Sequence, residues 1–152
     1  MTTNAVFQKE LKRSKRSVII VAELLKRRGY RVEIHPDLGV PDECDIYIWV
    51  RGRKKHIEVK HSRTLDFTGV SDINYKDVII DRAHRIDWRL EHNINDLHAY
   101  YLCNWNLTKA IVLTPRSRKY WFKMATPIKR DNEIASLYYI PRDKIRKVVN
   151  LR

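Results

Sequence analysis

Two acidic residues and a lysine are spaced so that two neighbouring strands would bring them together. Asp45 stands near the start of a run typical of a β-strand, Cys44–Val50, and Glu58 and Lys60 follow in a second such run, Lys55–Lys60. Side chains two residues apart on a strand leave the same face of the sheet. Antiparallel pairing of the two strands then places Asp45 beside Glu58 and Lys60.

Such a group of side chains suits metal-assisted hydrolysis of a phosphodiester. Mg²⁺ prefers oxygen ligands and typically takes one or two carboxylates together with waters and substrate phosphate oxygens. A neighbouring lysine can orient or deprotonate the attacking water and stabilise negative charge on the phosphate. A bound divalent cation, Mg²⁺ or Mn²⁺, would act as a Lewis acid and lower the pKa of its water. The three residues therefore predict a catalytic site with a divalent cation as cofactor.

At these positions the chain resembles the PD-(D/E)xK nuclease superfamily, which includes restriction endonucleases, Holliday-junction resolvases and many phage nucleases. The family motif is an acid at the start of one strand, followed in the next strand by Asp or Glu, any residue, and Lys. Here these are Asp45 and Glu58-Val59-Lys60, and their spacing lies inside the family range. Pro41-Asp42 also spells the first two letters of the motif, but Asp42 belongs to the loop before the strand. The resemblance covers roughly residues 5–115.

The resemblance carries expectations for the fold and for further site residues. It implies an α/β fold with an αβββαβ core, in which a central mixed sheet is flanked by helices. It implies that Asp45 and Glu58 bind the metal with help from the backbone carbonyl of Val59, and that Lys60 positions the water. The first helix often supplies another acid, for which Glu10 is preferred over Glu23. Polar residues just beyond the lysine often reach the phosphates, and here these are His61, Ser62 and Arg63.

Periodicity and breakers predict the elements that would position these residues. Apolar residues recur at helical spacing from Asn4 to Arg28, and Gly29 follows at the usual C-cap place. Gly52 can take the positive φ of a short turn at Arg51–Lys54. The other expected elements are strands at Tyr30–His35, His98–Cys103, Lys109–Thr114 and Ser136–Ile140, a long loop at Thr64–Lys76, a helix at Asp81–Asn93 and a short last helix at Arg142–Val149.

Charge is the strongest global property of the sequence. Thirty-one Lys and Arg residues oppose 18 Asp and Glu residues, which gives a formal net charge of +13. Such an excess favours a polyanionic partner, and DNA is the first expectation, with RNA left open. Two rows of basic residues could lie along phosphates. The first row could instead be a solvated helix face, and the second could instead pair with Asp81, Asp87 and Glu91. The rows are Lys12, Arg13 and Arg16 in the first helix, and Arg82, Arg85 and Arg89 in the second.

Length and composition limit the class of protein. A chain of 152 residues suits one nuclease-like domain, with a core at about 5–115 and a basic, aromatic extension at 116–152. No apolar run reaches 18 residues and no convincing signal peptide is present, which predicts an intracellular protein, in the cytoplasm or at the nucleoid, with a phage origin as one option. Cys44 and Cys103 fall in expected strands and are predicted to be buried apolar residues.

Two functions from different classes fit the sequence. The first is a metal-dependent endodeoxyribonuclease, with structure-selective, resolvase-like cutting as one form; resolvases act as homodimers, although the sequence shows no clear dimer face. The second is a nucleic-acid-binding protein with the same fold and no catalytic activity, which explains the charge of +13 equally well.

Overall fold

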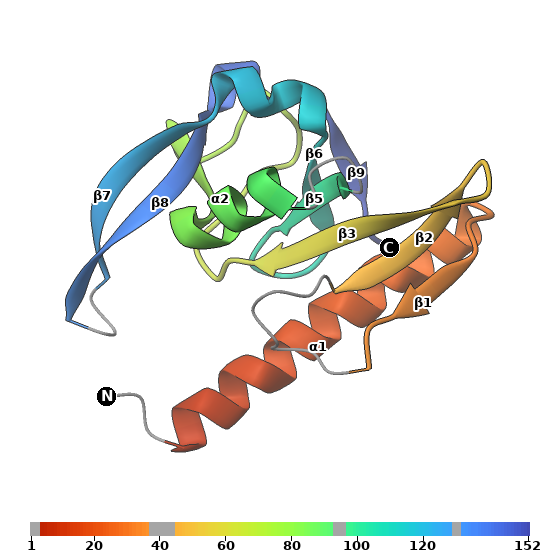
Figure 1. Cartoon of the computed structure of the whole chain (residues 1–152). Coiled ribbons are helices and arrows are strands. Elements are labelled where there is room, and N and C mark those ends of the chain that lie inside the picture. The colour runs from red at the N-terminus through yellow and green to blue at the C-terminus, as the bar shows by residue number, and fades with distance from the viewer. Residues whose placement is uncertain (1–3, 37–44, 93–96, 129–131) are drawn as a thin grey trace.

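The computed structural model describes residues 4–36, 45–92, 97–128 and 132–152, and for residues 4–14 it describes the backbone alone. Two sheets and two main helices make up an α/β fold (Figure 1). The larger sheet is mixed, in the order β1-β2-β3-β5-β6-β9, and the smaller is antiparallel, in the order β4-β8-β7. The elements are α1 (Asn4–Arg27), β1 (Val32–Ile34), β2 (Ile46–Val50), β3 (Arg53–His61), β4 (Asp77–Arg82), α2 (Ala83–His92), β5 (Leu97–Cys103), β6 (Lys109–Leu113), the 3₁₀ turn η2 (Pro115–Tyr120), β7 (Phe122–Ile128), β8 (Glu133–Pro141), the 3₁₀ turn η3 (Arg142–Lys144) and β9 (Val148–Asn150).

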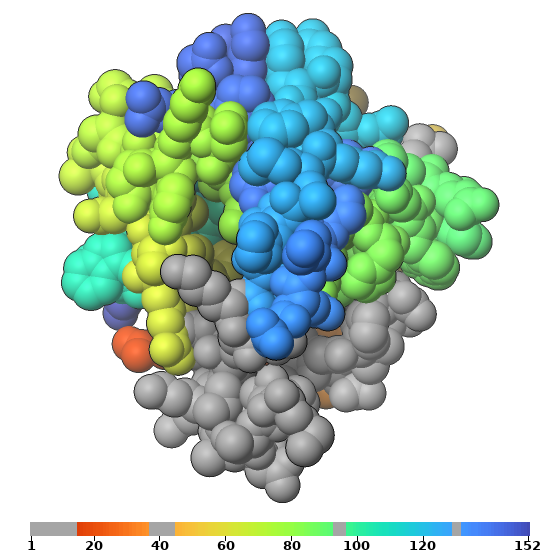
Figure 2. Space-filling model, turned by 90° about the vertical axis from the view of Figure 1, so that its left-hand side faces the viewer, coloured from red at the N-terminus to blue at the C-terminus, as the bar shows by residue number. Residues whose placement is uncertain are grey.

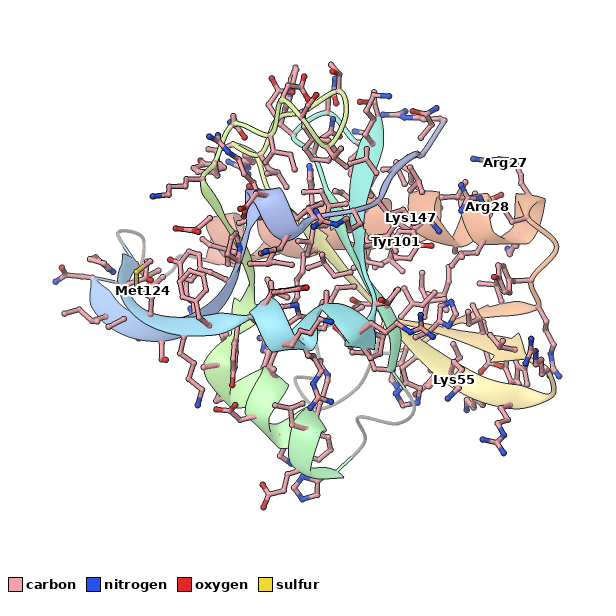
Figure 3. The ribbon with its side chains drawn as sticks, turned by 90° about the horizontal axis from the view of Figure 1, so that it is seen from above. Arg27, Arg28, Lys55, Tyr101, Met124 and Lys147 are labelled. Carbon is pink, nitrogen blue, oxygen red and sulfur yellow. The ribbon has the colours of Figure 1, made fainter. Side chains whose placement is uncertain are left out.

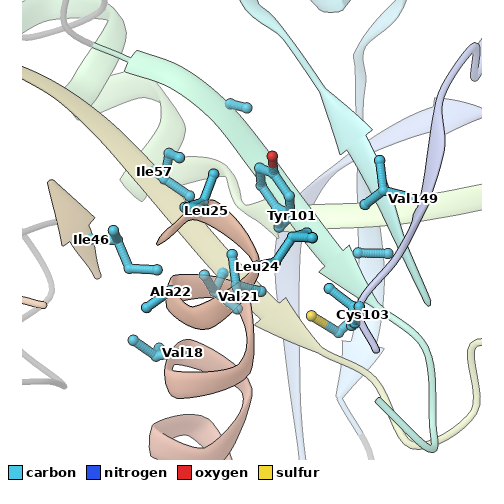
Figure 4. Close-up of a cluster of buried hydrophobic side chains, with 14 of the residues drawn as sticks. Val18, Val21, Ala22, Leu24, Leu25, Ile46, Ile57, Tyr101, Cys103 and Val149 are labelled. Carbon is cyan, nitrogen blue, oxygen red and sulfur yellow. The ribbon is translucent and has the colours of Figure 1, made fainter. Parts of the chain in front are cut away.

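Helix α1 covers one face of the larger sheet, as its apolar spacing predicts. Val18, Val21 and Leu25 are at most 2% exposed and pack against strand residues such as Ile46 and Ile57 (Figure 4). The helix ends at the expected place, since Gly29 has a φ of +91° and follows directly after the last turn. Within the described ranges, no helix is both long and apolar enough to cross a membrane.

The β2–β3 hairpin is tighter than the sequence predicts. Its turn consists of Arg51 and Gly52 alone, both with positive φ (53° and 77°), as a two-residue type I′ turn requires. Val50 therefore pairs with Arg53, and β3 begins earlier than the predicted Lys55. At the other end of the hairpin Ile46 pairs with Ile57, so the next position along the antiparallel ladder sets Asp45 beside Glu58.

The chain returns to the larger sheet through a crossover, since β5 runs parallel to β3. The crossover contains α2 and also β4. Strand β4 does not belong to the larger sheet but pairs with β8 in the smaller one. The prediction of one central mixed sheet is thus confirmed only in part, because the chain also forms the smaller antiparallel sheet. The smaller sheet extends away from the C-terminal end of α1, as the positions of Met124 and Arg27 show in Figure 3. The expected loop at 64–76 lacks helix and strand, and Leu65, Phe67 and Ile73 anchor it in the core between α2 and the sheet.

The segment after residue 116 belongs to the body of the fold. The predicted last helix, Arg142–Val149, is wrong, because only the short turn η3 forms before the chain extends into β9. Val149 and Leu151 both point inward, and Leu151 is 1% exposed. The C-terminal end of the chain therefore completes the apolar layer that packs against α1. The alternation of inward and outward side chains in β9 outweighs the tendency of Pro141 to start a helix.

Candidate active site

Alternation along β3 sends its polar and apolar side chains to opposite faces of the sheet. Ile57 and Val59 are buried against α1. Glu58 and Lys60 therefore point to the other face, where β4 and α2 lie. Cys103, on the neighbouring β5, is buried in the α1 layer as predicted, with its pKa raised to about 12 by burial.

Asp45 joins these residues from the start of β2. Its Oδ2 accepts a hydrogen bond of 2.8 Å from the backbone N–H of Val59. Burial raises the pKa of Asp45, although the Val59 N–H and the Lys60 and Arg89 charges act in the opposite direction. The predicted trio of Asp45, Glu58 and Lys60 is thus held on one face by adjoining strands.

Glu58 is the most constrained member of the trio. It is 3% exposed, and its Oε1 lies 3.0 Å from Nη2 of Arg89 in an ion pair. That oxygen has no aligned hydrogen-bond donor within the described part of the chain. Burial, reinforced by the Asp45 charge, raises the pKa of Glu58 to about 8, against the opposing effects of Arg89 and Lys60. This carboxyl therefore gives up its proton less readily than an exposed glutamate does, and a bound cation would favour its ionised form.

A third acid, Asp81, completes the cluster. Nζ of Lys60 lies 3.2 Å from Asp81 Oδ1, and Nη1 of Arg89 lies 3.3 Å from Asp81 Oδ2. Burial alone would raise the pKa of Asp81, but Lys60, Arg85 and Arg89 together hold it below its usual value. From the sequence, Asp81 is predicted to start a helix and to serve as an ion-pair partner of the arginines. The overlooked signal is that Asp81 directly follows the apolar residues of β4, much as Asp45 directly precedes those of β2.

The predicted row of Arg82, Arg85 and Arg89 is not a single exposed row, because Arg85 and Arg89 pair with Asp81 as the alternative expected, while phosphate contact by Arg82 and Arg85 stays a prediction. Arg82 ends β4 and pairs with Glu133 at 3.0 Å, while α2 begins one residue later. Arg89 is 8% exposed and also donates a 2.6 Å hydrogen bond to the Tyr100 hydroxyl. Arg85 is half-buried and lies 3.7 Å from Asp81. Arg85 and Arg89 face buried carboxylates because these acids require compensating charge in a region with little water.

The three residues that follow Lys60 have different surroundings. The ring of His61 lies on the opposite side of β3 from Lys60, with Nε2 3.1 Å from the Trp105 carbonyl oxygen. The Ser62 hydroxyl accepts hydrogen bonds from the N–H groups of Thr64 and Leu65, and so closes a turn. Arg63 is exposed. Of the three predicted phosphate contacts, Arg63 is thus the one presented to solvent.

Helix α1 contributes no described side chain to this cluster. Glu23, the second choice for an extra acid, lies on the exposed side of α1 and pairs with Lys26 at 3.9 Å, across the sheet from Lys60. Arg16 is exposed. The predictions for Glu10, Lys12 and Arg13 concern side chains outside those that the structure describes.

A groove of about 430 Å³ opens beside Lys60 and Asp81. It lies where residues 60–65 run next to β4 and β8, on the face shown in Figure 2. Four of its side chains are cationic and one is an acid, so the charged lining of the groove is positive on balance. The charged lining residues are Lys60, Arg63, Asp81, Arg82 and Arg85.

The donor set of the cluster fits a hard divalent cation. Both Asp45 and Glu58 are acids whose burial opposes ionisation, and Glu58 Oε1 has no aligned donor within the described ranges. No group of three or more Asp, Glu, His or Cys side chains in those ranges forms a ready metal cage. Mg²⁺ accepts such a sparse set, since waters and phosphate oxygens complete its shell. Asp45, Glu58 and the Val59 carbonyl remain the predicted ligands.

Replacement of Glu58 by glutamine should change how stability depends on pH. Because the pKa of Glu58 rises from 4.5 to about 8 on folding, the folded wild type binds more protons than the unfolded chain between those values and loses stability as pH increases. Glu58→Gln removes that loss. In thermal unfolding with EDTA, the Tm of the variant minus that of wild type should increase by about 5 °C or more from pH 5 to pH 8.5. Parallel curves for the two proteins would contradict a raised pKa.

Comparison of the chain with protein-family models, with curated proteins and with solved structures gave no significant match.

Proposed function

We propose that the protein is a metal-dependent endonuclease of the PD-(D/E)xK type, which hydrolyses phosphodiester bonds in DNA. The order of α1, β1, β2, β3, α2, β5 and β6, with β3 and β5 parallel, supports the αβββαβ core expected of that family. The observation that carries the proposal is the convergence of Asp45, Glu58 and Lys60 at one place on two paired strands, with Glu58 3% exposed and close enough to Asp45 for the two charges to interact. Such an arrangement is costly to stability and is typical of sites that bind a cation.

Asp45, Glu58 and the Val59 carbonyl would hold Mg²⁺ or Mn²⁺. When bound, the cation would supply Lewis acidity at the scissile phosphate and lower the pKa of a coordinated water. The Val59 N–H fixes the Asp45 carboxylate through its 2.8 Å hydrogen bond to Oδ2, which also orients Oδ1. Rigid placement of the acids by two paired strands reduces the reorganisation that the reaction requires.

Lys60 lies between Asp81 and the groove, where a substrate phosphate or the attacking water would bind. Its Nζ lies 3.2 Å from Asp81, and 29% of its side chain is exposed at the groove. It can therefore orient an attacking water or stabilise charge on a phosphate oxygen while Asp81 limits its motion. Arg89 is paired with both Asp81 and Glu58, shields them from bulk solvent and balances their negative charge.

A nucleic-acid-binding protein without catalytic activity is the second candidate. Three cations, Lys60, Arg85 and Arg89, already balance the three acids of the cluster. A binder would retain this cluster as a structural network and use the net charge of +13 for its affinity. It predicts salt-sensitive binding with no hydrolysis at any concentration of Mg²⁺ or Mn²⁺.

Cleavage assays with and without metal separate the two candidates. We expect nicking of labelled DNA in Mg²⁺ or Mn²⁺ and none in EDTA. At limiting Mg²⁺ the rate should increase between pH 6 and pH 8, because Glu58 must lose a proton before it binds the cation. A four-way junction, a flap, linear duplex and the matching RNAs, tested at equal salt, would define the substrate. Light scattering would test the predicted homodimer. Binding without cleavage under all conditions would favour the second candidate.

A further inference from the structure

The face of the sheet that carries the acid cluster continues across β1, β2 and β3 as a regular grid. Tyr47 pairs with Glu33 on one side and with His56 on the other, and Trp49 pairs with Lys54. All of these side chains share the face of Glu58, since they stand at even spacing from it or opposite such positions. The acid pair thus forms one row of the grid, and Tyr47 and Trp49 form the next two rows toward the hairpin turn.

This part of the face has no helix over it among the described elements. Helix α1 packs behind β1–β3, while α2 lies in front of the sheet near β3 and β5 (Figure 1). Tyr47 and Trp49 are half-buried, and neither belongs to the apolar core. Two large aromatic side chains on a strand face that no described helix covers, next to a charged cluster, are unusual for a surface that only contacts water.

Cations surround both rings. The guanidinium of Arg31 lies 4.0 Å from the ring centroid of Trp49, and Nζ of Lys54 lies 4.0 Å from that of Tyr47. The adjoining turn adds the exposed Arg51. Glu33 is the acid of β1 on this face, so positive charge dominates it. The grouping of aromatic and basic residues is the one found where single-stranded nucleic acid binds, with bases stacked on rings and phosphates held by cations.

We infer that this aromatic face, defined by Tyr47, Trp49, Arg31 and Lys54, binds unpaired DNA bases and leads the strand to the acid cluster. Its role as part of a nuclease substrate site rests on the proposed function, whereas its binding of single strands does not. A base stacked on Tyr47 or Trp49 would replace the cation now over that ring, and Arg31 or Lys54 would then move to the neighbouring phosphate. The preferred substrate is accordingly DNA with an unpaired segment, such as a flap, rather than continuous duplex.

The test is the double variant Tyr47→Leu/Trp49→Leu, which keeps apolar volume and removes both rings. Anisotropy of labelled oligothymidylate in EDTA should show affinity weakened about five- to a hundredfold, with duplex affinity nearly unchanged. Phe122→Leu is the matched control, because Phe122 is a half-buried strand aromatic stacked on Tyr139, away from the hairpin. That control should bind oligothymidylate like wild type. Thermal unfolding should confirm that both variants are folded.

The outcomes separate this inference from the proposed function. Single-strand affinity that is unchanged in the double variant, reduced equally by Phe122→Leu, or absent in wild type would overturn the aromatic face. Equal losses for single strand and duplex would overturn the preference for unpaired bases, and binding of oligouridylate alone would overturn the assignment to DNA. If wild type binds oligothymidylate through these rings and cleaves nothing, the nuclease proposal fails while the aromatic face stands.

Discussion

Replacement of Lys60 by methionine is expected to reduce DNA cleavage about 10²- to 10⁴-fold while leaving DNA affinity close to that of wild type. Methionine keeps the apolar stem of the side chain and removes the ammonium group that lies 3.2 Å from Asp81 at the groove. Asp81 retains Arg85 and Arg89 as partners, so the fold should survive the change. Single-turnover cleavage at saturating Mg²⁺, with binding measured separately in EDTA, gives the two quantities.

Lys76→Met is the matched control for that experiment. Lys76 is exposed and lies in the segment before β4, outside the acid cluster, so its loss should leave cleavage within about twofold of wild type. Asp45→Asn, purified in the same way, should also be inactive and so excludes a contaminating nuclease. If Lys60→Met cleaves like wild type, Lys60 has no part in the chemistry. If binding and cleavage fall together, Lys60 contacts phosphate without assisting the reaction.

The parts of the site that could be predicted from sequence are those fixed by short-range geometry. The alternation of Glu58 and Lys60 follows from two-residue periodicity, and a turn containing Gly52 sets the register that brings Asp45 to Glu58. Helix α1 was predictable because its apolar stripe is long and Gly29 marks its end. In each case the relevant residues lie within one helix or one hairpin.

The rest of the cluster depends on long-range packing that local patterns do not encode. Asp81 and Arg89 reach Glu58 only because β4 pairs outside the larger sheet and α2 buries Arg89 together with Ala83 and Ile86. Three arginines at spacings of three and four predict an exposed row on a helix, because burial of Arg89 is favoured only by acids that lie far from it in the sequence or outside α2. The smaller sheet was missed for a similar reason, because the pairing of β4 with β8 joins segments that are far apart in the chain.

Arg89→Met should be the most destabilising single change in the described part of the cluster. Arg89 is 8% exposed and lies 3.0 Å from Glu58, 3.3 Å from Asp81 and 2.6 Å from the Tyr100 hydroxyl. Its removal leaves buried acids short of one cation, which typically costs about 3–5 kcal/mol. Chemical unfolding at pH 8.5, where Glu58 tends to ionise, should show the full loss, and Tm should fall by about 6–20 °C.

The same experiment distinguishes a buried charge network from simple loss of packing. At pH 5 Glu58 is protonated, so the cost of Arg89→Met should shrink, whereas a packing defect would cost the same at both pH values. Arg85→Met, which removes a half-buried cation 3.7 Å from Asp81, should cost about 1 kcal/mol or less. Adding Glu58→Gln to Arg89→Met should restore part of the stability at pH 8.5, since it removes the unpaired acid. Additive effects of the two changes would mean that Arg89 and Glu58 are not energetically coupled, and that Glu58 is available to a metal without competition from Arg89.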